Sequence, residues 1–327
     1  MTPSGRALVR LLLVTTLALA PALAFAQGPG KTASRRKAPV PVQVKGTRVS
    51  LAPPEGFTEA KSFSGFRQEE TGASLMVTEL PLPFAKVSQG LTAEALTSQG
   101  MEPLSRKPAK VGGHKGFLVQ ARQSSGDQVF LKWILVLGDD SDTLVLTAAW
   151  REQDSKALSR PLERAVRSTR WDRDAEPGPG LELFTLKQTP GLKEAQRVQN
   201  TVLYTRDGKP PGTPPTEGPS LIVAPSLANT HVGEDVEAFS RVRLDAAGRG
   251  LTVESSALLT VDGLKGHEVV AHGKDSTTQR DFTLYHVLLL DEGRYFLLQG
   301  RVGGEDRAAY LEHFKTAVRS FQRVPIP

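Results

Sequence analysis

The chain has 327 residues, of which 39% are apolar and 23% charged, a balance typical of a soluble protein long enough for two domains. It contains no cysteine, which excludes disulfides and thiolate chemistry. The net charge of +6 is spread along the chain and not collected in one segment, which argues against a nucleic-acid-binding protein.

The first 26 residues have the three parts of a secretory signal. Arg6 and Arg10 precede an apolar stretch, 11–23, that is too short to span a bilayer, and residues 24–26 form an Ala-Phe-Ala cleavage site. We therefore expect cleavage after Ala26 and a periplasmic or secreted protein. No later segment is apolar for long enough to predict a transmembrane helix.

A basic tether and then a first β-rich domain follow the signal. Residues 27–46 are rich in glycine, proline, lysine and arginine without periodicity, which predicts a flexible tether. A first domain is expected over 47–172. Short runs of branched and aromatic residues predict its strands at 74–80, 116–122, 129–137 and 143–150. The turn at 138–142 makes the last two strands a hairpin.

Two helices are predicted in this first domain. One lies at 92–100, between strands. The other begins near Ser159 and repeats apolar residues at helical spacing through Leu162, Ala165 and Val166. Pro161 is compatible with this helix as a residue of its first turn, where the amide has no helical partner.

The order of motifs then recurs. Residues 173–181 are rich in charge, proline and glycine and predict a linker before a second domain over 182–325. "GASLMV" at Gly72 matches "GPSLIV" at Gly218, and "VGGHKG" at Val111 matches "VDGLKG" at Val261. The offsets between matches differ by a few residues, as loop insertions would produce. The sequence therefore predicts a tandem duplication.

The second copy ends in a predicted amphipathic helix. Its apolar stripe is Leu311, Phe314, Val318 and Phe321. Each copy is expected to be an α+β domain in which helices cover an antiparallel sheet.

Both copies resemble the PsbP-like superfamily, which includes the DcrB-like envelope proteins of bacteria. The resemblance is carried by "PPEGF" at 53–57, the "GASLMV" strand, the V-x-G-x-x-G turn into a β-meander and the closing helix. It implies two tandem PsbP-like domains with a binding or assembly role, and it carries over no catalytic residue.

Three histidines are weak metal-site candidates. His267 and His272 stand five residues apart, whereas the histidines of a zincin helix stand four apart. Their segment predicts a strand, where an odd separation sends two side chains to opposite faces. His286 lies on the next predicted strand. No third ligand is evident, so we expect no metal and no cofactor.

Two loops are also considered as binding sites. The acidic segment 139–142 is short for a calcium loop and is interpreted as a hairpin turn. Lys209, Pro211 and Pro214 belong to a proline-rich insertion that only the second copy has, with P-x-x-P spacing. They are candidate partner-binding residues, and a stiff surface loop is the alternative interpretation.

No complete catalytic motif is present, and no G-x-S-x-G elbow. We therefore expect a non-enzymatic interaction or assembly module of the cell envelope with an unknown envelope protein as partner. One alternative is a carrier of a small apolar ligand, with a pocket lined by residues such as Leu135, Leu146, Leu289 or Leu297. A hydrolase using scattered carboxylates or histidines is the other. The sequence leaves the oligomeric state and the domain orientation open.

Overall fold

The computed structural model describes residues 40–125, 128–210, 218–226, 235–247, 250–275, 278–291 and 294–324. The chain divides between Leu181 and Glu182 into two compact units, called here the first unit and the second unit and described separately. The predicted signal peptide lies outside the described residues. No helix within the described ranges is long and apolar enough to cross a membrane.

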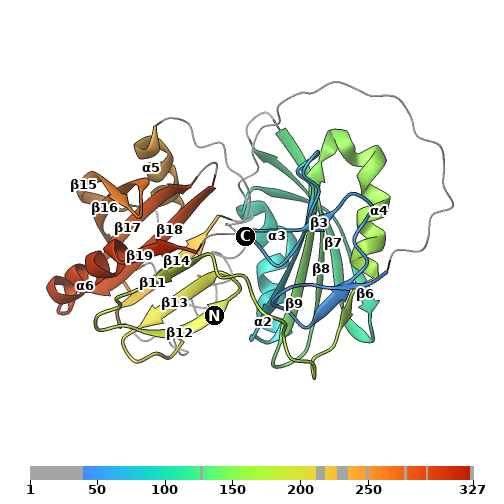
Figure 1. Cartoon of the computed structure of the whole chain (residues 1–327), viewed down its shortest axis with the longest axis horizontal. Helices are drawn as coiled ribbons and strands as arrows, with labels where there is room; N and C mark the ends of the chain where they lie inside the picture. The colour runs from blue at the N-terminus through green and yellow to red at the C-terminus, as the bar shows by residue number, and fades with distance from the viewer. Residues whose placement is uncertain are drawn as a thin grey trace. The chain divides into compact units, whose positions relative to one another are not determined.

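The first unit is built on a seven-stranded antiparallel sheet with the order β3-β4-β5-β9-β8-β7-β6 (Figure 1). Central strand β9 is buried at eight of its nine positions because it carries apolar or small residues on both faces. The strands are β3 (Thr58–Glu59), β4 (Gly65–Arg67), β5 (Ser74–Leu80), β6 (Met101–Val111), β7 (His114–Ser125), β8 (Gln128–Gly138) and β9 (Thr143–Arg151).

Helices pack on both faces of this sheet. The long helix α4 (Ser155–Arg167) buries Leu158, Leu162, Ala165 and Val166 in one cluster with sheet residues that include Leu118 and Leu135. Phe117 precedes Leu118 on β7 and therefore points to the other face. There it contacts Phe84 of the short helix α2 (Phe84–Ser88). The turn η2 (Gln89–Leu91) and α3 (Ala93–Ser98) continue from α2.

A small three-stranded ribbon joins the two ends of the first unit. It consists of β1 (Val42–Gln43), β2 (Val49–Leu51) and β10 (Arg170–Trp171), with β2 in the middle. The Glu79 carboxylate accepts hydrogen bonds from the Arg48 amide at 2.7 Å and the Trp171 indole at 2.7 Å. The predicted tether to residue 46 is thus wrong at its end, because Val42 and Gln43 are paired with β2.

The second unit has a seven-stranded antiparallel sheet with the order β12-β13-β14-β18-β17-β16-β15, the same connectivity as in the first. A two-stranded ribbon of β11 (Phe184–Leu186) and β19 (Phe321–Arg323) joins its ends. The sheet strands are β12 (Lys193–Val198), β13 (Thr201–Thr205), β14 (Ser220–Pro225), β15 (Thr252–Val261), β16 (Leu264–Lys274), β17 (Asp281–Asp291) and β18 (Arg294–Gly303).

Two helices pack on opposite faces of the second sheet as well. Helix α6 (Arg307–Arg319) buries Tyr310, Phe314, Ala317 and Val318 with Val287, Leu289 and Leu298. Helix α5 (Val236–Ala247) packs on the alternate sheet positions, where Leu244 meets Val269, Ala271 and Leu284. Both units are therefore α+β structures with antiparallel sheets.

The recurring V-x-G-x-x-G motif has one physical explanation in both units. Its first glycine is the second residue of a two-residue hairpin turn, in which both residues have positive φ. The φ angles are 55° and 89° at Gly112 and Gly113 in the first unit, and 50° and 76° at Asp262 and Gly263 in the second. Its second glycine lies where two strands approach closely. A Cβ on Gly116 would stand 1.8 Å from the Val136 carbonyl oxygen.

Two helix predictions are wrong in detail. Helix α4 begins at Ser155, directly after the 3-10 turn η3 (Glu152–Asp154), so Pro161 lies inside the helix and not in its first turn. The Ser155 hydroxyl, at the first residue of this helix, accepts a hydrogen bond from the Trp150 indole at 3.0 Å. Phe321 is not part of α6, because the helix ends at Arg319 and Phe321 pairs with Leu186.

Candidate functional site

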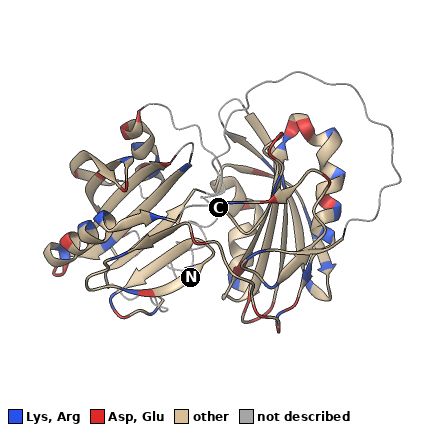
Figure 2. Cartoon of the chain, viewed as in Figure 1, with Lys and Arg blue, Asp and Glu red and all other residues tan. Residues whose placement is uncertain are grey.

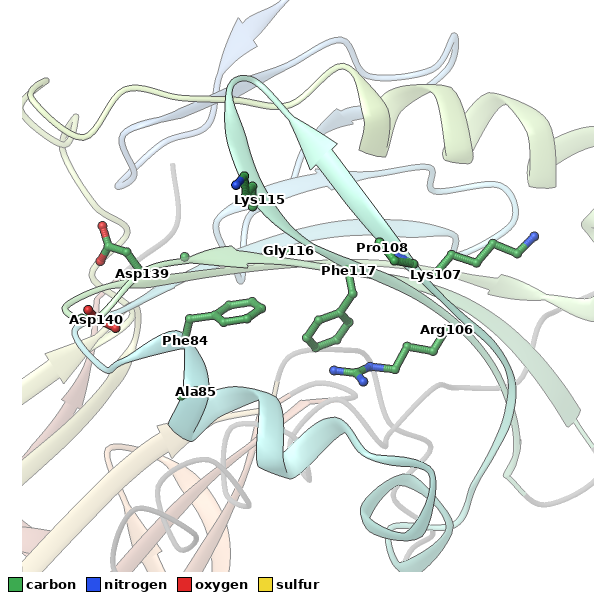
Figure 3. Close-up of a pocket in the computed structure, with 11 residues that line it drawn as sticks. Phe84, Ala85, Arg106, Lys107, Pro108, Lys115, Gly116, Phe117, Asp139 and Asp140 are labelled. Carbon is green, nitrogen blue, oxygen red and sulfur yellow. The ribbon is translucent and has the colours of Figure 1, made fainter.

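An open hollow of about 610 Å³ lies at one end of the first unit's sheet, between α2 and the β6–β7 hairpin (Figure 3). Four segments from three separate parts of the sequence line it, two of them being the strands of one hairpin. These segments are α2, β6, the start of β7 and the turn between β8 and β9. Its lining residues are Phe84, Ala85, Arg106, Lys107, Pro108, Lys115, Gly116, Phe117, Gly138, Asp139 and Asp140.

Two phenylalanines and one arginine form the centre of the hollow. The rings of Phe84 and Phe117 are 5.6 Å apart and tilted by 59°. The Arg106 guanidinium lies over the Phe117 ring, 3.9 Å from its centroid. This stacking covers one face of the guanidinium and leaves the N–H groups along its edge available to a planar anion such as a carboxylate.

Cations border the hollow on the side of the β6–β7 hairpin. Arg106, Lys107 and Lys115 are exposed, and Lys110 lies on the same hairpin just outside the lining. None of these four cations has an ion-pair partner among the described residues, although ion pairs are common elsewhere in both units. Charged residues of both signs are otherwise interspersed over each unit (Figure 2).

The opposite side of the hollow is the acidic turn 138–142. The Asp139 carboxylate accepts hydrogen bonds from the Ser141 amide at 2.9 Å and the Asp142 amide at 3.3 Å, and it pairs with Arg173. These amides and then Arg173 hold the pKa of Asp139 below its ordinary value. Arg173 also pairs with Asp142 at 2.9 Å. The turn is thus closed by a guanidinium, while Asp140 has no ion-pair partner in the described residues.

This arrangement provides groups that can bind charged and apolar chemical groups. Arg106 and the two lysines attract an anionic group, the phenylalanine rings accept an apolar one, and Asp140 faces a cationic one. The residues that line the hollow include no histidine, serine or cysteine.

The equivalent end of the second unit lacks these groups. When the two hairpin turns are aligned, Ser256 stands in place of Arg106, Ala257 in place of Lys107 and His267 in place of Phe117. Lysine recurs only at Lys265. The aromatic and cationic combination is therefore specific to the first unit.

His267 and His286, two of the predicted histidines, lie on the α5 face of the second sheet and are fully buried. His286 contacts the Gln299 amide at 2.9 Å and the Ser240 hydroxyl of α5 at 3.2 Å. Burial and then the nearby His267 lower the pKa of His286 to about 3. His267 lies 3.3 Å from the Glu237 carboxylate without a hydrogen bond, and burial lowers its pKa too.

His272 lies on the other face of β16, separate from this pair. It is 2.5 Å from Glu254 and 3.4 Å from the Thr283 hydroxyl. Within the described residues no group of three or more histidine, aspartate or glutamate side chains is placed to hold a metal ion. The structure thus brings together two of the three candidate histidines and leaves the third apart.

The other predicted site residues lie away from the hollow. Lys209 is exposed and its amide donates to the Thr205 hydroxyl, while Pro211 and Pro214 lie outside the described residues. The four leucines suggested for an apolar carrier are all in packed clusters and none lines the hollow; they are Leu135, Leu146, Leu289 and Leu297.

Comparisons with known proteins give likenesses of fold alone. No family model matches the chain, and no curated protein matches its sequence. Cyanobacterial PsbP from Synechocystis sp. PCC 6803 is similar over 44% of this chain and 98% of its own, with 13% identity and a TM-score of 0.32. A PsbP structure is thus among the matches, as the sequence resemblance predicted.

Two further matches come from other bacteria. LpqN of Mycobacterium tuberculosis, described as involved in cell envelope biogenesis, is similar over 43% of this chain and 83% of its own, with 10% identity and a TM-score of 0.32. The immunity protein TplEi of Pseudomonas aeruginosa is similar over 88% of this chain and 98% of its own, with 10% identity and a TM-score of 0.31.

Proposed function

We propose that the protein is a non-enzymatic interaction module of the cell envelope that holds a segment of a partner protein in the hollow of the first unit. The observation that carries this proposal is the stacked Arg106 beside Phe84 and Phe117, at a site whose cations lack acidic partners among the described residues. Arginine and aromatic residues are the types that contribute most to protein–protein binding. Export is expected from the signal pattern of residues 1–26.

The chemistry of the hollow defines the partner segment. An apolar side chain would rest on Phe84, while an adjacent carboxylate would take two hydrogen bonds from the edge of Arg106. Lys107 and Lys115 would add longer-range attraction for the same acidic group. Asp140, at the other side, disfavours a uniformly acidic polymer. The best ligand is therefore a mixed peptide with acidic and apolar residues side by side.

A random-peptide phage library panned on the mature protein tests this function. We expect enrichment of sequences with an acidic residue beside an aromatic or aliphatic one. Labelled synthetic copies of these peptides, followed by fluorescence anisotropy, should lose about tenfold or more in affinity with Arg106→Ala or Phe84→Ala, which corresponds to about 1.4 kcal/mol. The matched control is Lys110→Ala, a charge loss on the same hairpin outside the hollow, which should change affinity by about twofold or less.

Two results would overturn the proposal. The first is enrichment of peptides without acidic residues, or binding that Arg106→Ala leaves unchanged. The second is native mass spectrometry of protein purified from its envelope fraction that shows an added mass of a few hundred daltons, because this would favour the small-ligand carrier.

A further inference from the structure

The two sheets differ in how they protect their outer edges. In the first unit the edge strand is β6, which carries Pro103 and Pro108 together with the exposed cations Arg106, Lys107 and Lys110. Proline offers no amide to an incoming strand, and charges repel a second copy of the same edge. These are the devices with which proteins prevent edge-to-edge pairing.

Strand β15, the edge of the second unit, has none of these devices from Ser255 to Val261 (Figure 1). This stretch, "SSALLTV", contains no proline and no charge. Leu258 is 66% exposed and Val253 is 51% exposed, which are unusual values for large apolar residues on a strand. A long, uncharged and partly apolar edge is a template for strand addition.

The hairpin turn determines which backbone groups face outward. Because Asp262 and Gly263 form a two-residue turn, Val261 and Leu264 are a hydrogen-bonded pair, and such pairs alternate along the ladder. Ser256, Leu258 and Thr260 therefore fall in the pairs without mutual hydrogen bonds, and their N–H and C=O groups point away from β16. No strand among the described residues pairs with this edge.

We propose that β15 is a homodimerisation edge, at which it pairs antiparallel with β15 of a second copy about a two-fold axis at Leu258. In this register Leu258 lies opposite the partner's Leu258, so the two exposed leucines meet on one face of a sheet that continues through both copies. Ser256 lies opposite the partner's Thr260, which places a hydroxyl against a hydroxyl.

Charge favours a second copy as the occupant. The uncharged centre of the strand meets its own image without repulsion, whereas self-pairing of β6 would bring its cations together. Acidic residues meet only at the ends, where Glu254 lies opposite the partner's Asp262. Each is already neutralised within its own chain, Glu254 by Arg307 and Asp262 by Arg323 at 3.1 Å. The edge is thus self-complementary.

Sedimentation equilibrium of the full mature chain, from about 1 to 100 µM, tests this proposal. We expect a dimer whose dissociation constant rises at least tenfold with Leu258→Lys. Leu104→Lys is the matched control, since it places the same charge at an exposed leucine of the β6 edge. It should leave the dissociation constant unchanged. Both sites are exposed, and far-UV circular dichroism checks that each variant is folded.

Two further measurements locate the interface. The chain has no cysteine, so Leu258→Cys introduces a single thiol that a short bis-maleimide should crosslink between copies, whereas Leu104→Cys should not be crosslinked. Hydrogen exchange should show protected amides at Ser256, Leu258 and Thr260 in the wild type and exposed ones in Leu258→Lys. A wild-type monomer at 100 µM would overturn the proposal, as would a dimer that Leu258→Lys does not weaken.

Discussion

Lys132 gives the sharpest test of the energetics of the first unit. It stands in the middle of β8 between Ala121 and Ala149 on the neighbouring strands, and it is only 2% exposed. Its ammonium has no ion pair or hydrogen bond among the described residues. Burial lowers the pKa of Lys132 from 10.5 to about 8. The folded state therefore pays a penalty for the charged form that the unfolded state does not.

The size and pH window of this penalty follow from linkage. The fall in the pKa of Lys132 from 10.5 in the unfolded chain to about 8 in the folded protein corresponds to about 3 kcal/mol of lost stability. The full loss applies below pH 8, where Lys132 is protonated in both states. Between pH 8 and 10.5 the unfolded state binds more protons than the folded one, so stability rises with pH and the penalty disappears. Lys132→Met should therefore raise the free energy of unfolding by about 3 kcal/mol at pH 7, and should remove this rise at alkaline pH.

Intrinsic fluorescence makes the assay specific for one unit. The three tryptophans, Trp133, Trp150 and Trp171, all lie in the first unit, so urea unfolding followed by tryptophan emission reports on that unit. Lys110→Met, at an exposed position of the same sheet, is the control and should change stability little. The reasoning is refuted if Lys132→Met leaves the free energy of unfolding unchanged or lowers it at pH 7, since the ammonium would then be well solvated or paired in the folded protein.

Two other perturbations extend these arguments. The pKa of His286 is about 3 in the folded protein and 6.5 in the unfolded chain, so the unfolded state binds more protons as the pH falls. The free energy of unfolding of the second unit should therefore drop by about 2 kcal/mol between pH 6.5 and 5. Urea unfolding followed by tyrosine emission should show this loss, and His286→Gln should remove it if the histidine is its source. Gly116→Ala should lower the free energy of unfolding of the first unit by about 1–3 kcal/mol, because the new Cβ would overlap the Val136 carbonyl. Gly180→Ala, which meets nothing within 4 Å, should have no effect, and equal losses for the two variants would contradict the packing argument.

The sequence indicates the central strands and helices well and the edges poorly. Strands β5, β8 and β9 are recognisable because branched and aromatic residues fill both of their faces. The two-residue and three-residue strands of the ribbons are too short to show a period. Strand β6 is not evident in the sequence because its two prolines and its cations, which protect an exposed edge, interrupt the apolar pattern of a strand. Strand β15 is not evident in the sequence either, because almost all of its positions are exposed and it shows no alternation of buried and exposed residues.

The hollow was not predictable from any one motif. Phe84 comes from a five-residue helix, Arg106 from an edge strand that the sequence does not indicate, and Asp140 from the predicted turn of a hairpin. The register that pairs Pro108 with Phe117 brings these groups together, and register is a property of the folded sheet. The available signal was Arg106-Lys107-Pro108 ahead of the glycine-rich turn. The histidines, by contrast, were visible in the sequence, but only the sheet shows that they pack under α5.

The ribbons that join the ends of each unit have a mechanical consequence. In the second unit Phe184 pairs with Arg323, so the incoming and outgoing chain leave the ribbon at the same end. Tension along the chain would load the hydrogen bond from the Val324 amide to the Leu183 carbonyl first, and then the pairs Phe184–Arg323 and Thr185–Gln322 one after another. Bonds loaded singly in this way unzip at low force, whereas strands pulled lengthwise past each other share the load. A unit stretched by its ends should thus open at its ribbon while the seven-stranded sheet stays intact.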